Sequence, residues 1–154
     1  MPLLEFLTPE AVIASLRAPT KKQALHELAA HAARLTGEDE RRIFETLLQR
    51  ERLGSTGIGE GIAIPHGKLP GLSRLFGLLA RFERPVDFEA LDGQPVDLAF
   101  LLLAPEGAGA DHLKALSRIA RAIREPGTLD RLRKARDAAA LYAVVTEAST
   151  PRAA

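Results

Sequence analysis

Apolar residues in the first third of the chain recur every three or four positions, which is the spacing of amphipathic helices. Residues 8–18 begin with Thr-Pro-Glu, a typical helix start, and predict a short helix. Residues 20–36 begin with a Thr-Xaa-Xaa-Gln capping box, and residues 38–53 begin with three acidic residues. Both segments end before a glycine and predict longer helices.

The middle of the chain changes to short apolar runs bounded by proline, glycine and aspartate, a pattern typical of strands. Residues 62–64 predict a short buried strand that a proline ends, and residues 75–82 predict a longer one. A short extended piece is expected around 86–88, before the Asp-Gly turn at 92–93. The run VDLAFLLL at 96–103 is almost wholly apolar, as expected for a central strand buried on both faces.

Helical spacing returns in the last third. Asp111 is expected to cap a helix that ends before Pro126, and two further helices are expected at 129–134 and 137–147. Helices thus precede and follow a central group of strands. This order predicts an α/β fold, a single domain whose mixed central β-sheet is covered by helices on both faces.

Length and composition fit that prediction. The chain has 154 residues and is 46% hydrophobic, enough for one core; the domain is expected at 1–148 and a disordered tail at 149–154. A net charge of +1 provides no general attraction for nucleic acid or an anionic membrane. There is no cysteine, which excludes disulfides and thiolate chemistry. Without a signal peptide or membrane span in the sequence, a cytoplasmic protein is expected.

The strongest candidate for chemistry is the stretch STGIGEGIAIPHGK, residues 55–68, with four glycines, one proline and one histidine. The predicted strand and the proline after it place His66 at a strand end, outside the core. An unperturbed imidazole is mostly neutral at pH 7, so His66 is a competent nucleophile. The glycines allow several backbone N–H groups to face one bound anion. The residues alone also fit a structural histidine that follows a strand.

Other familiar sites do not match. Gly61 and Gly67 are separated by five residues instead of the four of a P-loop, and no serine sits in a G-x-S-x-G elbow. His26 and His31 are five residues apart on a predicted helix, and there is no H-E-x-x-H motif. We therefore expect no nucleoside triphosphatase, serine hydrolase, metal or cofactor.

Two further residues have a functional and an ordinary interpretation. His112 falls in the first turn of a predicted helix, where free N–H groups favour an anion and keep an imidazole neutral. It could equally be a plain surface histidine. Arg50 lies in the last turn of a predicted helix, where a cation interacts favourably with the helix C-terminus.

The segment GIGEGIAIPHGK resembles the IIA proteins of the fructose/mannitol type in the bacterial phosphoenolpyruvate-dependent phosphotransferase system. The resemblance extends to RERLGSTG at 50–57, PVDFEALDGQPVDLAFLLLAP at 85–105 and DHLKALSRIA at 111–120, so it covers most of the chain. Within this family, Lys68 after the PHG and the FEALDGQPVDL segment are most similar to the nitrogen-regulatory branch.

The resemblance implies that Nε2 of His66 accepts a phosphoryl group from a histidine of a small phosphocarrier protein. Arg50 and His112 match family positions beside the active histidine. Ser55 matches a family position too, and its hydroxyl either hydrogen-bonds the phosphate or the ring, or simply forms a turn. Nδ1 of His66 is then expected to donate to a backbone carbonyl.

The resemblance further implies a regulatory phosphotransfer protein, not a metabolic enzyme, whose partner binding changes when His66 is phosphorylated. Its family partners are the phosphocarrier and regulatory targets such as potassium-transport systems and sensor kinases. Two alternatives stay open. One is a sugar-specific IIA component that passes the phosphoryl group to a IIB protein, and the other is an interaction module whose His66 is never phosphorylated.

Overall fold

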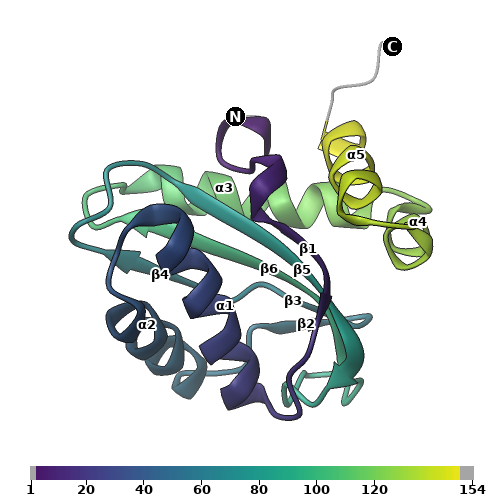
Figure 1. Ribbon diagram of the computed structural model, residues 1–154, viewed down its shortest axis with the longest axis horizontal. Coiled ribbons are helices and arrows are strands. Elements are labelled where there is room, and N and C mark those ends of the chain that lie inside the picture. The colour runs from purple at the N-terminus through teal and green to yellow at the C-terminus, as the bar shows by residue number, and fades with distance from the viewer. Residues whose placement is uncertain (1–2, 150–154) are drawn as a thin grey trace.

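The computed structural model describes residues 3–149 as one mixed β-sheet between two layers of helices (Figure 1). The strands are β1 (Val12–Leu16), β2 (Gly57–Gly59), β3 (Ile62–Ala63), β4 (His66–Leu69), β5 (Phe76–Val86) and β6 (Val96–Pro105). The α-helices are α1 (Lys21–Thr36), α2 (Glu40–Arg52), α3 (Ala110–Arg124), α4 (Thr128–Lys134) and α5 (Ala138–Ser149). Residues 150–154 of the expected tail lie outside the described residues, and Ser149 ends α5.

The sheet has the order β1-β5-β6-β3-β2, and β4 also pairs with β6. β5 and β6 are antiparallel at its centre, whereas β1 runs parallel to β5, and both β3 and β4 run parallel to β6. Strands β3 and β4 therefore follow one another along the same side of β6. This arrangement confirms the predicted mixed sheet.

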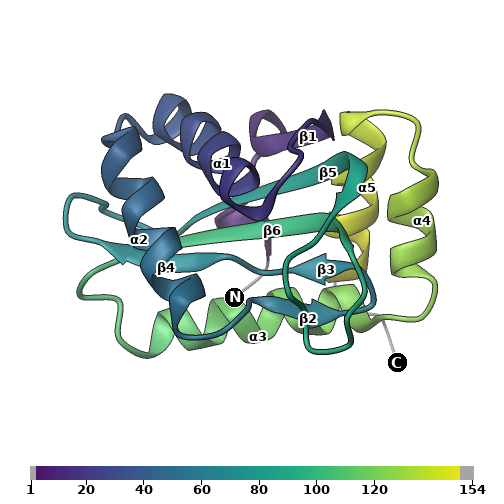
Figure 2. The same ribbon diagram turned by 90° about the horizontal axis from the view of Figure 1, so that it is seen from below.

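Helices α1 and α2 cover one face of the sheet, and α3 and α5 cover the other, with α4 packed against both of them (Figures 1 and 2). Between these layers, residues 98–104 of β6 are each at most 1% exposed. The prediction of a central strand buried on both faces is confirmed. No helix in the described part of the chain is long and apolar enough to cross a membrane.

The two long N-terminal helices begin and end within two residues of their predicted bounds. The hydroxyl of Thr20 accepts the backbone N–H of Gln23 at 3.1 Å, and Gly37 ends α1 with a φ of 78°. Asp39 caps α2 by accepting the backbone N–H of Arg42 at 3.0 Å. Each capping residue lies within a few residues of the helix end that it stabilises, so it can be recognised from the local sequence alone.

The helix predicted at 8–18 is wrong. The Thr-Pro-Glu start forms only the 3-10 turn Pro9–Ala11, and the apolar residues after it form β1. Val12 pairs with Leu79 of β5, so the segment gains a buried place in the sheet that a helix of this length could not match. The spacing of its apolar residues also fits a short strand, which local sequence could not distinguish from a helix turn.

Three smaller boundaries also differ. Asp111 is not the cap of α3, because the helix begins at Ala110 and its N-cap is Gly109. The segment around 86–88 is not a separate piece, since β5 continues through Pro85 with an irregular register. Likewise, β4 begins at His66: the carbonyl of Pro65 still accepts the N–H of Leu102 at 2.9 Å, so pairing with β6 resumes immediately after the break.

Candidate functional site

His66, Arg50 and His112 meet at one end of the sheet although they come from three separate elements. His66 begins β4, Arg50 lies in the last turn of α2, and His112 lies in the first turn of α3. Nε of Arg50 is 3.3 Å from Nε2 of His66, and the two imidazole rings are 5.4 Å apart between centroids at an angle of 56°. Helix α2 lies against β4, as Figure 2 shows.

The hydrogen bonds of His66 define its tautomer. Nδ1 is 2.8 Å from the carbonyl oxygen of Ile64, and a carbonyl can only accept, so Nδ1 carries the ring proton. Nε2 then has a free lone pair, toward which Arg50 donates from Nε. The nucleophilic nitrogen is therefore Nε2, and the backbone carbonyl expected from the sequence is that of Ile64.

Burial keeps both imidazoles neutral. It is the main cause that lowers the pKa of His66 below its ordinary value; the hydrogen bond to the Ile64 carbonyl opposes it, and the charge of Arg50 adds to it. The pKa of His112 is lowered by burial first, then by the nearby His66 and Lys68. A neutral His66 has its Nε2 lone pair available at pH 7, as a nucleophile requires.

Arg50 combines the two interpretations that its sequence position allows. Nη1 donates to the carbonyl of Gly54 at 2.9 Å, just beyond the end of α2, as a basic residue near a helix C-terminus does. Nε of the same guanidinium faces His66. The first bond holds the side chain where the second can form. Arg52, two residues on, is exposed.

His112 has an unsatisfied nitrogen. Its Nε2 is buried without a hydrogen-bond partner, and it is the only such buried nitrogen or oxygen among the side chains that the structure describes. A buried polar atom without a partner costs on the order of 1–3 kcal/mol. The ring also faces His66, so an anion bound at Nε2 of His66 could supply the missing partner.

Ser55 lies in the turn between α2 and β2, and its hydroxyl is engaged by backbone groups. It donates to the carbonyl of Phe88 at 2.5 Å and accepts the N–H of Gly57 at 3.0 Å. These bonds support the turn-forming interpretation of Ser55 and tie the turn to the loop after β5. The hydrogen bonds of Ser55 thus shape the surroundings of the site.

Gly67 allows α2 to lie close to β4. A Cβ at this position would be 2.5 Å from Cγ2 of Thr46, whose hydroxyl is fixed by donating to the carbonyl of Arg42 at 2.8 Å. The threonine cannot turn away without losing that bond. The glycine after His66 therefore sets the distance between the histidine and the helix that carries Arg50.

Replacement of Gly67 by alanine should lower the free energy of unfolding by about 1–3 kcal/mol, because the added methyl group overlaps Thr46. Urea unfolding measures this. The variant Thr46→Ala is the matched control, and in the double variant most of the loss should be recovered. An equal loss in the single and double variants would contradict the proposed overlap.

The glycines at 57, 59 and 61 do not surround the histidine, contrary to the expectation that they face an anion there. They build a hairpin, in which Glu60 and Gly61 join β2 to β3 with φ values of 58° and 81°. Gly61 accepts the N–H of Asp97 at 2.9 Å, whereas His66 pairs with Leu102. Asp97 and Leu102 are five residues apart on β6, which corresponds to roughly 16 Å, so the Glu60–Gly61 turn lies far from His66.

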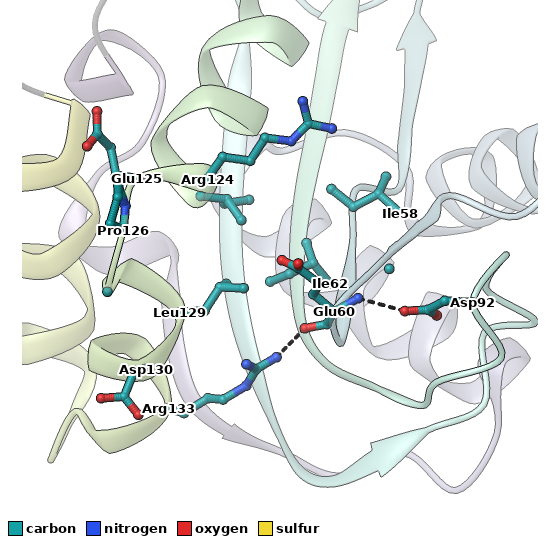
Figure 3. A pocket seen from close by; sticks show the side chains of 13 residues that line it. Ile58, Glu60, Ile62, Asp92, Arg124, Glu125, Pro126, Leu129, Asp130 and Arg133 are labelled. Carbon is teal, nitrogen blue, oxygen red and sulfur yellow. Dashed lines mark hydrogen bonds between the residues drawn. The ribbon is translucent and has the colours of Figure 1, made fainter.

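This hairpin borders a separate hollow of about 730 Å³, between β2–β3 and the turn from α3 to α4 (Figure 3). The backbone of Glu60 is held from two sides: its carbonyl accepts from Arg133, and its N–H donates to Asp92 at 2.9 Å. Arg133 also pairs with Asp97 at 2.7 Å. These contacts brace the hairpin, and the hollow contains none of the predicted site residues.

Two charged residues near the site were not predicted. Glu51 is buried beside Arg50, and Lys21 at the start of α1 pairs with it at 2.8 Å. A signal was available, since position 51 is four residues after Leu47 and so continues the apolar face of α2. A glutamate on that face must be buried, and a buried carboxylate needs partners.

Comparison with known proteins places this arrangement in a family. The model of the phosphoenolpyruvate-dependent sugar phosphotransferase system EIIA 2 family matches residues 5–148. The nitrogen regulatory protein of Bradyrhizobium diazoefficiens is 62% identical over 145 residues, which cover 94% of this chain and 95% of that protein. The nitrogen regulatory protein of Pseudomonas aeruginosa is 44% identical over 146 residues, with coverage of 94% and 95%.

Solved structures agree. The nitrogen regulatory protein IIA-Ntr from Neisseria meningitidis has a TM-score of 0.88 at 35% identity, covering 94% of this chain and 99% of that one. The mannitol IIA protein of Escherichia coli shares the fold, with a TM-score of 0.75 at 20% identity and coverage of 90% and 98%. The chain belongs to the EIIA type-2 family of the phosphoenolpyruvate-dependent sugar phosphotransferase system, in which it is similar to the nitrogen regulatory proteins.

Proposed function

We propose that this protein is a regulatory phosphoryl acceptor, in which Nε2 of His66 takes a phosphoryl group from a phosphohistidine of a phosphocarrier protein. The observation that carries the proposal is the fixed tautomer of His66. Its Nδ1–H donates to the carbonyl of Ile64, and the lone pair of its unprotonated Nε2 accepts from Nε of Arg50 at 3.3 Å. The guanidinium thus already lies at the nitrogen that would attack, where the oxygens of an arriving phosphoryl group need a positive charge.

The transfer requires no proton to leave the site. The lone pair of Nε2 forms the new P–N bond, and the bond from phosphorus to the donor imidazole breaks, leaving its electron pair on the donor nitrogen. The proton on Nδ1 stays in place, and the Ile64 carbonyl stabilises the positive charge that develops on the ring of His66. Catalysis then consists of alignment and stabilisation of the phosphoryl oxygens.

Two side chains are placed to contact those oxygens. The guanidinium of Arg50 faces the lone pair that attacks, so it can move from Nε2 onto the arriving phosphoryl group while Gly54 still anchors Nη1. The unpartnered Nε2 of His112, when it carries the proton, can donate to a second oxygen. Arg50 is thus an electrostatic group of the reaction, and His112 a hydrogen-bond donor.

Regulation is favoured over sugar transport by the relatives. Proteins named nitrogen regulatory protein are 62% and 44% identical to this chain over nearly their whole length. In this proposal phosphorylation places a dianion at His66 and changes the binding of regulatory targets, such as potassium-transport systems or sensor kinases. One observation supports the sugar-specific alternative. The mannitol IIA protein of Escherichia coli, which has the same fold, forms a complex with phosphorylated IIB. The interaction module remains the third possibility.

The test is an intact-mass measurement after incubation with phosphoenolpyruvate, the enzyme that charges the carrier, and the cognate phosphocarrier. We expect one acid-labile phosphoryl group on this protein. This phosphoryl group should not be transferred to fructose- or mannitol-specific IIB proteins when these are added. Rapid transfer to such a IIB protein would favour the sugar-specific alternative, and no uptake from a charged carrier would favour the interaction module.

The rate of phosphoryl uptake should fall only at pH values below the ordinary pKa of histidine, about 6.5. The neutral ring is the nucleophile and burial lowers the pKa of His66, so protonation removes activity as the pH falls through that lowered pKa. Initial rates from a pre-charged carrier measure this. An NMR titration of the His66 ring, which does not involve the donor, should give the same midpoint. A midpoint at or above the ordinary value would contradict the expectation.

A further inference from the structure

A buried carboxylate one residue from Arg50 has no part in the reaction as described so far. The side chain of Glu51 is 3% exposed, and its Oε1 is 2.8 Å from Nζ of Lys21. The same oxygen accepts the backbone N–H of Thr56 at 3.0 Å, and Oε2 accepts the hydroxyl of Thr56. Both oxygens are therefore engaged, and Thr56 is held at two atoms.

From Thr56 the hydrogen bonds continue to the nucleophile. The carbonyl of Thr56 accepts the N–H of Ile64 at 2.9 Å. The carbonyl of Ile64 in turn accepts Nδ1–H of His66 at 2.8 Å. Three successive hydrogen-bonded contacts, linked through the backbone of Thr56 and of Ile64, thus join Glu51 to the nitrogen that fixes the tautomer of His66.

A second branch starts at Lys21. Its Nζ donates to the carbonyl of Phe88 at 3.2 Å and lies 5.6 Å from the centroid of the Phe88 ring. The same carbonyl accepts the hydroxyl of Ser55 at 2.5 Å. The carboxylate of Glu51 and its lysine therefore connect the start of α1, the end of α2, the turn before β2 and the loop after β5.

Stability alone does not account for such a pair. Taking a carboxylate and an ammonium out of water costs several kcal/mol per ion, and apolar residues of similar volume are often as stabilising. What apolar residues cannot do is fix Thr56 at its N–H and hydroxyl together. The geometry of the site needs this, because the carbonyl of Ile64 must point at Nδ1 of His66.

We infer that Glu51 is a positioning residue for phosphoryl transfer, which orients His66 through Thr56 and Ile64 and so keeps the proton on Nδ1 and the lone pair on Nε2. It contacts neither the phosphoryl group nor the donor. The negative charge of Glu51 also raises the pKa of His66, against the larger effect of burial, so the carboxylate is close enough to act on the ring. The inference rests on the proposed function of His66.

The test is Glu51→Gln, which keeps the size of the side chain but cannot accept from Thr56 at both oxygens. The matched control is Glu45→Gln on the same helix, whose carboxylate is exposed and pairs with Arg41 at 3.2 Å. In Glu51→Gln we expect phosphoryl uptake to slow on the order of tenfold. In nitrogen-15 NMR spectra, a measurable fraction of the protein molecules with neutral His66 should carry the ring proton on Nε2 instead of Nδ1.

A second pair of variants decides the matter if Glu51→Gln does not fold, as judged by circular dichroism. Thr56→Val removes the hydroxyl bond to Glu51 and should show the same tautomer shift, whereas Thr56→Ser keeps it and should match the unaltered protein. A folded Glu51→Gln or Thr56→Val protein with an unchanged tautomer and rate would overturn the inference. The tautomer is read without phosphorylation, so failure of the proposed function would not be confused with failure of this one.

Discussion

Replacement of His66 by glutamine should abolish phosphoryl uptake while the fold is retained. A glutamine can still donate to the carbonyl of Ile64, but its amide nitrogen has no lone pair available for attack. The measurement is the intact mass after exposure to the charged phosphocarrier, with circular dichroism as the check of folding. The control is His26→Gln, which alters an exposed histidine on α1. Uptake by His66→Gln at the rate of the unaltered protein would show that another residue is the acceptor.

Replacement of Arg50 by glutamine should slow phosphoryl uptake by roughly 10- to 150-fold, the equivalent of one charge-assisted hydrogen bond of about 1.5–3 kcal/mol. The guanidinium lies at Nε2 of His66 and is anchored on Gly54, so its charge is already in place when the phosphoryl group arrives. The pKa of His66 should also rise, because the charge of Arg50 contributes to lowering it.

Arg52 provides the matched control for that variant. It lies in the same last turn of α2 but is exposed, so Arg52→Gln removes the same charge from the same helix end. Single-turnover rates from the charged carrier should be unchanged in Arg52→Gln. Equal slowing in both variants would mean that Arg50 acts only through the general charge of the helix end.

Much of the fold could be predicted wherever the signals are local. Helices α1 and α2 are specified by their caps at Thr20 and Asp39, and β6 by a long apolar run. Strand β1 could not be predicted, because its structure depends on pairing with Leu79, far away in the chain. A five-residue apolar segment obtains its conformation from its neighbour in the sheet, not from its own sequence.

The candidate site, too, has features that the sequence could predict and features that it could not. Histidine after proline is a recognisable pattern, and the resemblance to a family brought Arg50 and His112 beside it. The carbonyl of Ile64 carries no sequence signal, because every residue has a carbonyl and only the folded chain shows which one faces Nδ1. The prediction that Gly57, Gly59 and Gly61 form an anion-binding turn was wrong for a related reason. Glycines that permit such a turn also permit a tight hairpin.

The central claim is that Nε2 of His66 carries the phosphoryl group, and NMR of the phosphorylated protein labelled with nitrogen-15 tests it most directly. Coupling between phosphorus and a ring nitrogen identifies the bonded atom. The structure predicts a single phosphoryl group coupled to Nε2 of His66, with Nδ1 still hydrogen-bonded to the Ile64 carbonyl. A phosphoryl group on Nδ1, or on any other residue, would contradict the account.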